Sequence, residues 1–323
     1  MRISVALCTH NGARFVGEQV ASILTQARLP DEIVLSDDAS ADSTVAIVVE
    51  AVRTAGAGAP ALTVIENPVA LGVVRNFEQA IQATTGDLIA LCDQDDVWER
   101  DRLEALARRF EADPGLLCVF TDATIIDGDG APTGATLFQS LELRADELNA
   151  VRDGRGFGAL LRRNLATGAT MIFRRSLLGA AAPFPAEWVH DEWLAIVAAA
   201  RSGLAVVESR PTRYRIHGAN AIGVIEPTLR YKLGRMLEPR GDRNRTLARR
   251  GSVLAERLPA MGATADLVAA ARRKAVFESR RARMPRNRLL RAVPVLLLAV
   301  TGAYGRYASR GLQDIARDLV QPA

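Results

Sequence analysis

Short apolar runs rich in β-branched residues alternate with stretches of helical periodicity over the first 122 residues of the chain. Apolar runs bounded by turn residues are typical of buried strands, and apolar residues spaced three and four apart are typical of helices. The predicted strands lie near residues 2–8, 31–36, 61–66, 87–92 and 116–122. The predicted helices lie near residues 13–28, 42–54, 73–84 and 99–111. This alternation predicts an α/β fold with a mostly parallel sheet.

The pattern becomes less regular after residue 123 and is helical at the end of the chain. Residues 127–130, Asp-Gly-Asp-Gly, predict a hairpin turn between short strands. Later elements are predicted as helices near 156–165 and 191–203 and as strands near 168–173 and 205–216. Helices are predicted beyond them near 226–238, 243–258, 264–283, 287–303 and 307–320. We therefore predict a sheet-containing domain over residues 1–223 and a helical region over residues 224–323.

Charge is distributed unevenly between these two parts. The formal net charge is +4, but residues 1–224 carry 20 basic and 29 acidic side chains, whereas residues 225–323 carry 21 and 8. An acidic body argues against a nucleic-acid-binding enzyme, because contacts to phosphates require a basic face. The basic C-terminal region is compatible with an anionic surface as its partner.

The cysteines and the N-terminus give information about the cellular compartment of the protein. Cys8, Cys92 and Cys118 are odd in number, lie in apolar runs and have no CxxC spacing, so neither a disulfide framework nor a zinc site is expected. The chain enters a strand at once and turns polar at Thr9, without the apolar core of a secretory signal. The longest apolar stretch, residues 292–303, is too short to span a bilayer. We expect a cytoplasmic location.

Three carboxylates follow the apolar run 88–92, as Asp93, Asp95 and Asp96. Ligands of open α/β sheets bind at the carboxyl ends of the strands. Carboxylates crowded there repel one another unless a cation lies among them. Oxygen ligands favour Mg²⁺ or Mn²⁺, which also hold substrate phosphates. The alternative is a solvated helix N-terminus capped by Asp96.

A second acidic cluster, with Asp37 and Asp38, follows the predicted strand at 31–36. Two acidic strand ends in one sheet suggest one site with two functions, although residues 38–42 are also compatible with a simple turn and helix cap. The first turn, residues 9–13, reads Thr-His-Asn-Gly-Ala. It has neither the GxGxxG nor the GxxxxGK[ST] pattern, so a dinucleotide fold of the usual kind and a P-loop are not supported.

Taken together and in this order, the motifs resemble those of glycosyltransferase family 2, whose members have the GT-A fold. The resemblance is carried by Val5–Gly12, Glu32–Ser40, Asn67–Gly72, Arg75-Asn76, Gly86-Asp87 and Asp93–Asp96. It continues more weakly through Gly168–Met171, His190–Trp193 and Tyr214–Asn220. Within the family the chain looks most like bacterial rhamnosyltransferase-type enzymes of surface-polysaccharide assembly. The family more often has Glu-Asp where this chain has His190-Asp191.

The resemblance implies a role for each matching residue. Asp191 would be the catalytic general base, and Asp93, Asp95 and His217 would hold the metal ion. The nucleotide sugar would be bound by Thr9, Asn11, Asp38, Arg75, Asp93, Thr170 and Arg215. Asp38 would contact the pyrimidine ring, and Arg215 and His217 would lie near the diphosphate. The implied donor is a dTDP- or UDP-sugar, with rhamnose favoured, and the implied acceptor is a glycan or a lipid-linked glycan.

Physical chemistry supports these roles independently. Displacement at an anomeric carbon passes through an oxocarbenium-like state, which needs a base on the acceptor side and neutralisation of the leaving group. A metal ion and an arginine can stabilise a departing diphosphate without a protonated acid. One carboxylate then suffices as the base, and this arrangement predicts inversion.

Other interpretations of the same residues stay open. A sugar nucleotidyltransferase would share the sheet and the metal, but residues 9–13 lack the glycine-rich basic loop expected of it. A non-catalytic scaffold that binds a nucleotide sugar would not need Asp191, whose role would then be only to cap its helix. A lone histidine such as His217 is more often structural than a ligand.

The basic C-terminal region has two interpretations. Basic side chains crowd residues 272–291 beside one acid, Glu278, and the apolar stretch 292–303 follows directly. Such a combination is typical of a helix that lies on an anionic membrane, here the inner face of the cytoplasmic membrane. The alternative is that these helices pack on the domain or on a second subunit, with solvated arginines.

Overall fold

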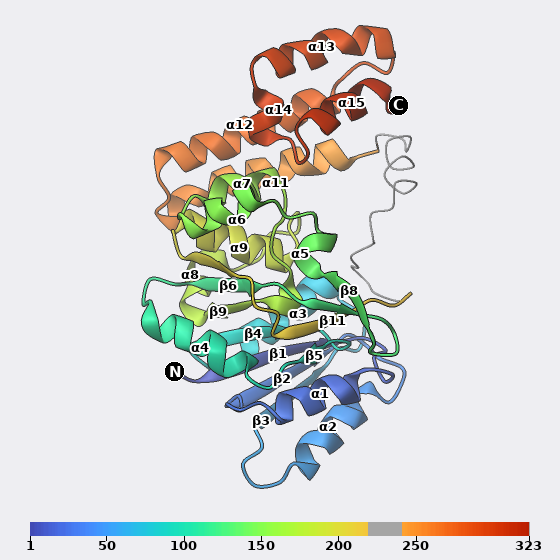
Figure 1. Ribbon diagram of the computed structural model, residues 1–323, viewed down its shortest axis with the longest axis vertical. Helices are drawn as coiled ribbons and strands as arrows, with labels where there is room; N and C mark the ends of the chain where they lie inside the picture. Colours follow the sequence, from blue (N-terminus) through green and yellow to red (C-terminus); the bar gives the residue numbers. More distant parts are fainter. Residues whose placement is uncertain (219–240, 323) are drawn as a thin grey trace.

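The computed structural model describes residues 1–218 and 241–322 of the chain. Among these residues, seven strands form the main sheet (Figure 1). Their spatial order is β10 (Leu204–Val207), β6 (Cys118–Thr121), β9 (Ile172–Arg174), β4 (Leu88–Cys92), β1 (Ile3–Thr9), β2 (Glu32–Asp37) and β3 (Ala61–Glu66). Neighbours are parallel except that β9 runs antiparallel to β4 and β6. The predicted mixed, mostly parallel sheet is confirmed.

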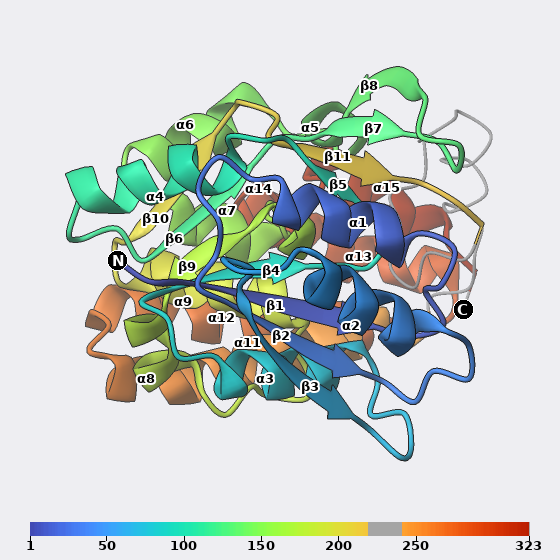
Figure 2. The same cartoon turned by 90° about the horizontal axis from the view of Figure 1, so that it is seen from below.

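Helices cover both faces of the sheet because its central strands are apolar on both sides. In β1, Val5 and Leu7 pack in the core beside α1, α2 and α4, whereas Ala6 and Cys8 pack in the core on the other face. The first group of helices is α1 (Val16–Leu24), α2 (Thr44–Thr54) and α4 (Arg102–Ala112). Figure 2 shows α1 and α2 in front of the sheet when it is seen from below.

The opposite face is covered by three other helices, and the C-terminal region packs on this side of the molecule. These are α3 (Val73–Ala83), α7 (Gly156–Arg162) and α9 (His190–Ala200). The short helices α5 (Leu137–Ser140), α6 (Ala145–Arg152) and α8 (Leu178–Ala181) connect the elements on this side. The helices predicted within residues 1–218 and the first five predicted strands are confirmed within a few residues at each end. Cys8, Cys92 and Cys118 are buried and unpaired.

Two predictions about strands were wrong. Residues 205–216 do not form one strand, because β10 ends at Val207 and β11 (Thr212–Arg215) pairs in a different sheet. Pro211 lies between them and cannot donate a ladder hydrogen bond. The predicted strand 168–173 begins as a 3₁₀ turn, Gly168–Thr170, and only Ile172–Arg174 is β9.

A second sheet lies beside the carboxyl ends of the main strands. Its order is β5 (Val97–Trp98), β11, β7 (Thr124–Ile126) and β8 (Pro132–Thr136). The predicted hairpin turn is confirmed between β7 and β8, where the Asp127 carboxylate accepts hydrogen bonds from the N–H groups of Asp129 and Ala131. This sheet fixes β11, which contains the predicted site residue Arg215 and is followed closely by His217.

The C-terminal region is helical, as predicted, over its described residues. Its helices are α11 (Arg243–Arg257), α12 (Ala265–Ala282), α13 (Arg288–Val300), α14 (Ala303–Tyr307) and α15 (Leu312–Val320). Leu254 and Leu258 belong to the same core as Trp193 of α9, so α11 packs directly on the sheet-containing domain. The predicted helix 226–238 and the predicted boundary at 223/224 lie outside the described residues. No described helix is both long and apolar enough to cross a membrane.

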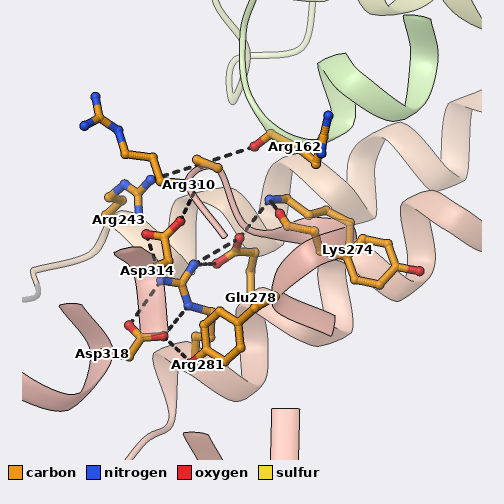
Figure 3. A network of polar contacts seen from close by, with 11 residues as sticks. Arg162, Arg243, Lys274, Glu278, Arg281, Arg310, Asp314 and Asp318 are labelled. Carbon is orange, nitrogen blue, oxygen red and sulfur yellow. Dashed lines mark hydrogen bonds and ion pairs between the residues drawn. The ribbon is translucent and has the colours of Figure 1, made fainter. Parts of the chain in front are cut away.

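A buried polar network holds α12 against α14 and α15 (Figure 3). Arg281 donates hydrogen bonds to Asp318 at 2.6 Å and to Glu278 at 3.1 Å, and it pairs with Asp314. Lys274 donates to Glu278 at 2.8 Å. These charges are almost fully buried. Lys274 and Arg281, both in the segment 272–291, therefore have internal partners and do not face solvent.

Candidate functional site

Three turns meet at the carboxyl edge of the main sheet. β4, β1 and β2 are parallel neighbours, with Leu7 opposite Cys92 and Thr9 opposite Asp37. The residues that follow each strand therefore emerge at one edge. This edge gathers the first turn (residues 9–12), the turn 37–40 and the acidic turn 93–96, as their positions in the sequence predicted.

Side-chain hydrogen bonds join the three turns. Gln94 accepts from the His10 N–H at 2.8 Å and donates to the His10 carbonyl at 3.0 Å. A Cβ at Gly12 would lie 2.2 Å from Gln94 Oε1, so a larger residue there would displace the Gln94 side chain. Thr9 donates to Asp37 at 2.6 Å, and the same carboxylate accepts from Ser40. The turns are thus fixed relative to one another.

Asp38 is almost buried and binds the segment that leads into α3. Its carboxylate accepts hydrogen bonds from the N–H groups of Leu71 at 2.6 Å and Gly72 at 2.8 Å. Gly72 has φ of 83°, a conformation that favours glycine. Asp38 therefore orders the loop 67–72, and its predicted contact with the nucleoside stays a prediction.

The other predicted donor-binding residues lie near this edge with different exposures. Asn11 is exposed and accepts a hydrogen bond from the Ala41 N–H at 2.9 Å. Arg75 lies in the first turn of α3, is half exposed and pairs with Glu78. The hydroxyl groups of Thr9 and Thr170 have internal acceptors, and both side chains are buried. Among these residues, Asn11 and Arg75 have the access that a ligand needs.

The acidic turn concentrates negative charge in a buried place. Burial, with repulsion from Asp95 and Asp191, raises the pKa of Asp93 to about 7. Burial, with repulsion from Asp95 and Asp93, also raises the pKa of Asp96. Asp96 accepts from the Arg215 N–H at 2.9 Å, but its second carboxylate oxygen has no partner among the described residues. Such an excess of buried carboxylate charge is what a cation would relieve.

His217 joins the acidic turn from the end of β11. Its Nε2 lies 2.9 Å from a carboxylate oxygen of Asp95, and its ring packs 4.6 Å from that of Phe15. Within the described residues no preformed group of three or more metal-ligand side chains occurs. Asp93, Asp95 and His217 nevertheless offer the oxygen and nitrogen donors that suit Mg²⁺ or Mn²⁺, and substrate phosphates commonly complete such sites. The residues present fit a divalent cation.

Arg215 serves to fix β11 in this structure. Its guanidinium donates to the Asp95 carbonyl at 2.7 Å and to the Glu18 carboxylate at 2.5 Å, and it is only 1% exposed. It thereby holds the acidic turn against β11 and α1. The predicted contact of Arg215 with a diphosphate stays a prediction, and these internal bonds indicate a positioning role.

Asp191 lies in the first turn of α9 and is held by two backbone groups. Its carboxylate accepts from the Gly168 N–H at 3.0 Å and the Glu192 N–H at 2.7 Å. Burial raises its pKa, whereas His190, the Gly168 N–H and Arg250 act to lower it. Asp191 also contributes to the raised pKa of Asp93, so the fold brings the two predicted carboxylates into one electrostatic environment.

The sequence did not predict a cluster of side chains that includes Arg250 of the C-terminal region and lies near Asp191. Arg250 of α11 pairs with Glu192 and stacks 4.2 Å from the Trp188 ring, and the Trp188 indole donates to the Arg250 carbonyl. Burial lowers the pKa of Arg250 to about 10, against the opposing effect of Asp191. A cavity of about 160 Å³ is lined by these three side chains together with residues of α7 and α12. No local motif marks Arg250, because its partners lie about 60 residues away in the chain.

Comparison with known proteins agrees with this geometry. The model of the family described as "Glycosyl transferase family 2" matches residues 4–168. The chain belongs to glycosyl transferase family 2. The match includes the three turns of the carboxyl edge and ends at Gly168, the residue that binds Asp191.

Relatives within the curated proteins are distant. The chain is 26% identical over 231 residues to "Uncharacterized glycosyltransferase alr2836" of Nostoc sp., covering 68% of this chain and 66% of that protein. It is 26% identical over 219 residues to "Uncharacterized protein Rv1520" of Mycobacterium tuberculosis, covering 67% of this chain and 59% of that one. The chain thus spans less than two thirds of the length of either relative.

Solved structures of low sequence identity share the fold. S. aureus TarS 1–349 in complex with UDP-GlcNAc has a TM-score of 0.56 at 17% identity, covering 97% of this chain and 92% of that chain. The mannosyltransferase PcManGT from Pyrobaculum calidifontis, in complex with GDP-Man and Mn²⁺, has a TM-score of 0.50 at 21% identity, covering 99% and 85%. The sheet and helices described above are therefore those of the GT-A fold.

Proposed function

We propose that this protein transfers a sugar from a nucleoside-diphosphate donor to an acceptor hydroxyl and inverts the configuration at the anomeric carbon. Asp191 is the general base, and Asp93, Asp95 and His217 hold a divalent cation. Membership of glycosyl transferase family 2 supports sugar transfer as the reaction class. The observation that carries the proposal is that Asp191, with a raised pKa, lies in the electrostatic environment of the acidic turn at the carboxyl edge.

The two backbone N–H groups that donate to the Asp191 carboxylate support its role as a base. They fix the carboxylate in one orientation without neutralising it, and burial increases its tendency to accept a proton. The carboxylate would take the proton of the acceptor hydroxyl as that oxygen attacks the anomeric carbon. Attack from the side opposite the leaving diphosphate gives inversion.

The acidic turn would act on the opposite side of the reacting carbon. A divalent cation, when bound by Asp93, Asp95 and His217, supplies positive charge to the departing diphosphate. Gln94 and Arg215 keep the turn in place through their bonds to His10 and to the Asp95 carbonyl. Asn11 and Arg75 are accessible from solvent and are the side chains that we assign to the donor.

We favour dTDP-rhamnose as the donor, on the resemblance of the motifs, with UDP-sugars as the alternative. The acceptor that we propose is a hydroxyl of a glycan or of a lipid-linked glycan. The cytoplasmic location inferred from the sequence, at the inner face of the membrane, stays a prediction.

A donor panel combined with one substitution tests this function. The panel contains dTDP-rhamnose, UDP-GlcNAc and GDP-mannose, each scored by thermal shift with and without Mn²⁺ and by sugar transfer. A ligand that binds the native state raises Tm, and we expect a Mn²⁺-dependent rise with at least one donor. Asp191→Asn is expected to keep this rise and to lose transfer by at least about a hundredfold, the effect of removing a general base.

Asp146→Asn is the matched control. Asp146 also lies in the first turn of a helix, α6, but it is exposed and paired with Arg144. Its substitution is expected to leave both readouts unchanged. Full transfer activity in Asp191→Asn, or the absence of a Mn²⁺-dependent shift with every donor, would falsify the proposed function.

A further inference from the structure

Helix α13 exposes a continuous apolar face to solvent. Leu289, Val293, Leu296, Leu297 and Val300 recur at the spacing of one helix face, and each is more than 60% exposed. Leu290 lies on the same side and is 63% exposed. Isolated exposed apolar side chains are ordinary, but a contiguous face of this kind marks an interaction surface.

The opposite face of α13 is fixed to the rest of the C-terminal region. Val295 and Leu298 pack in a core with Phe277 and Tyr304. Arg291 is buried and donates hydrogen bonds to the carbonyls of Asp318 at 3.0 Å and Gln321 at 2.7 Å, at the end of α15. Asn287 caps the helix by accepting from the Leu289 N–H. The apolar face therefore cannot turn inward without breaking these contacts.

Only positive charge surrounds this face along the chain. Residues 279–313 contain no acidic residue. Arg283, Arg286 and Arg288 are exposed immediately before the apolar face, and Arg306 is exposed after α13. An apolar helix face bordered by solvated arginines complements a surface that is both apolar and anionic. A second copy of the chain would bring like charges together at the same place.

We infer that the exposed face of α13 is a docking surface for an anionic lipid bilayer, into which its leucines and valines insert while the neighbouring arginines bind lipid phosphates. Figure 1 shows α13 at one extreme of the molecule, with α11 and α12 between it and the sheet. The surface is separate from the carboxyl edge, so docking leaves the site open. This inference does not depend on the proposed reaction.

Flotation of the full-length protein with lipid vesicles tests the docking surface. The wild-type chain is expected to float with phosphatidylglycerol-containing vesicles and to stay at the bottom with phosphatidylcholine alone. The double substitution Val293→Glu/Leu297→Glu is expected to reduce flotation by about tenfold or more, because it places charges in the inserted face. Val49→Glu is the control, since Val49 is an exposed valine on α2 at the opposite end of the molecule.

Size-exclusion chromatography of the same proteins distinguishes a bilayer from a second copy of the chain as the partner of this face. Equal flotation of the double variant and the wild-type chain overturns the proposal, as does a wild-type chain that stays at the bottom with anionic vesicles. A wild-type dimer that the double variant converts to a monomer, without vesicle binding, would assign the face to a second copy instead. Thermal unfolding of the double variant at the wild-type Tm shows that its loss of flotation is not a loss of folding.

Discussion

Position 168 shows how closely the backbone approaches Asp191, the proposed base. A Cβ on Gly168 would lie 3.0 Å from His190 Nε2 and 3.5 Å from the Asp191 Cβ. A glycine there allows its N–H to reach the Asp191 carboxylate at 3.0 Å. The sequence predicted Asp191 from its motif, but the partner that orients it lies 23 residues earlier in the chain. Local sequence does not report such contacts, because the fold alone brings them together.

The protonation state of Asp191 gives a prediction for the pH profile. A base must be ionised, and burial raises the pKa of Asp191 above its ordinary value of 3.8. The protonated form gains population as the pH falls, so kcat/KM for sugar transfer is expected to fall with it. We expect this fall of kcat/KM at low pH, the acid limb of the profile, at a higher pH than for an aspartate with an ordinary pKa. Initial rates measured from about pH 4 to 9 check it, and a flat profile down to pH 4 would contradict the prediction.

Among the elements, α11 links the C-terminal region to Asp191, the proposed base. Arg250 of this helix pairs with Glu192, and its charge lowers the pKa of Asp191. Arg250→Gln is therefore expected to raise the pKa of Asp191 and to move the acid limb of kcat/KM to higher pH. The pH profile of the variant, compared with that of the wild-type chain, is the measurement.

Arg249→Gln provides the comparison on the same helix. Arg249 is exposed and has no part in the cluster with Trp188 and Glu192. It is expected to leave the acid limb in place. Suppose instead that Arg250→Gln unfolds at the wild-type Tm and keeps the wild-type acid limb of kcat/KM. Arg250 of α11 would then not influence the pKa of Asp191.

The sequence predicted those strands that a local apolar pattern defines, but it did not predict pairings that depend on the whole fold. β1, β2 and β4 were predictable because a strand buried on both faces is a continuous apolar run. The separate pairing of β10 and β11 was not, since partners in a sheet are chosen by the whole fold. The antiparallel placement of β9 between β4 and β6 has the same origin. The site carboxylates were predictable because they directly follow strands whose ends meet at one edge.

On the scale of the whole molecule, the buried charges around Arg281 hold the last helices together. Removing one member of a buried ionic cluster leaves uncompensated charge and costs about 3–5 kcal/mol. Arg281→Met would leave Glu278, Asp314 and Asp318 without their central partner. We expect a loss of this size in the free energy of unfolding, measured by urea titration, together with faster proteolysis of α13–α15.

Arg280→Met tests whether this effect belongs to the network. Arg280 is the preceding residue and is exposed. Its substitution is expected to change the free energy of unfolding by less than about 0.5 kcal/mol, as for most surface positions. Equal effects of the two substitutions would show that the network contributes little.

The bonds of Gln94 to both backbone groups of His10 have a consequence for how such an enzyme can diversify. An amide group contains both a donor and an acceptor, so neither a carboxylate nor an amine could replace it without losing one of the two bonds. The acidic turn, which we propose to act on the diphosphate, is then held rigidly and tolerates little change. A change of donor is easier to accommodate in segments outside this frame, where new side chains can be accepted without disturbing the chemistry.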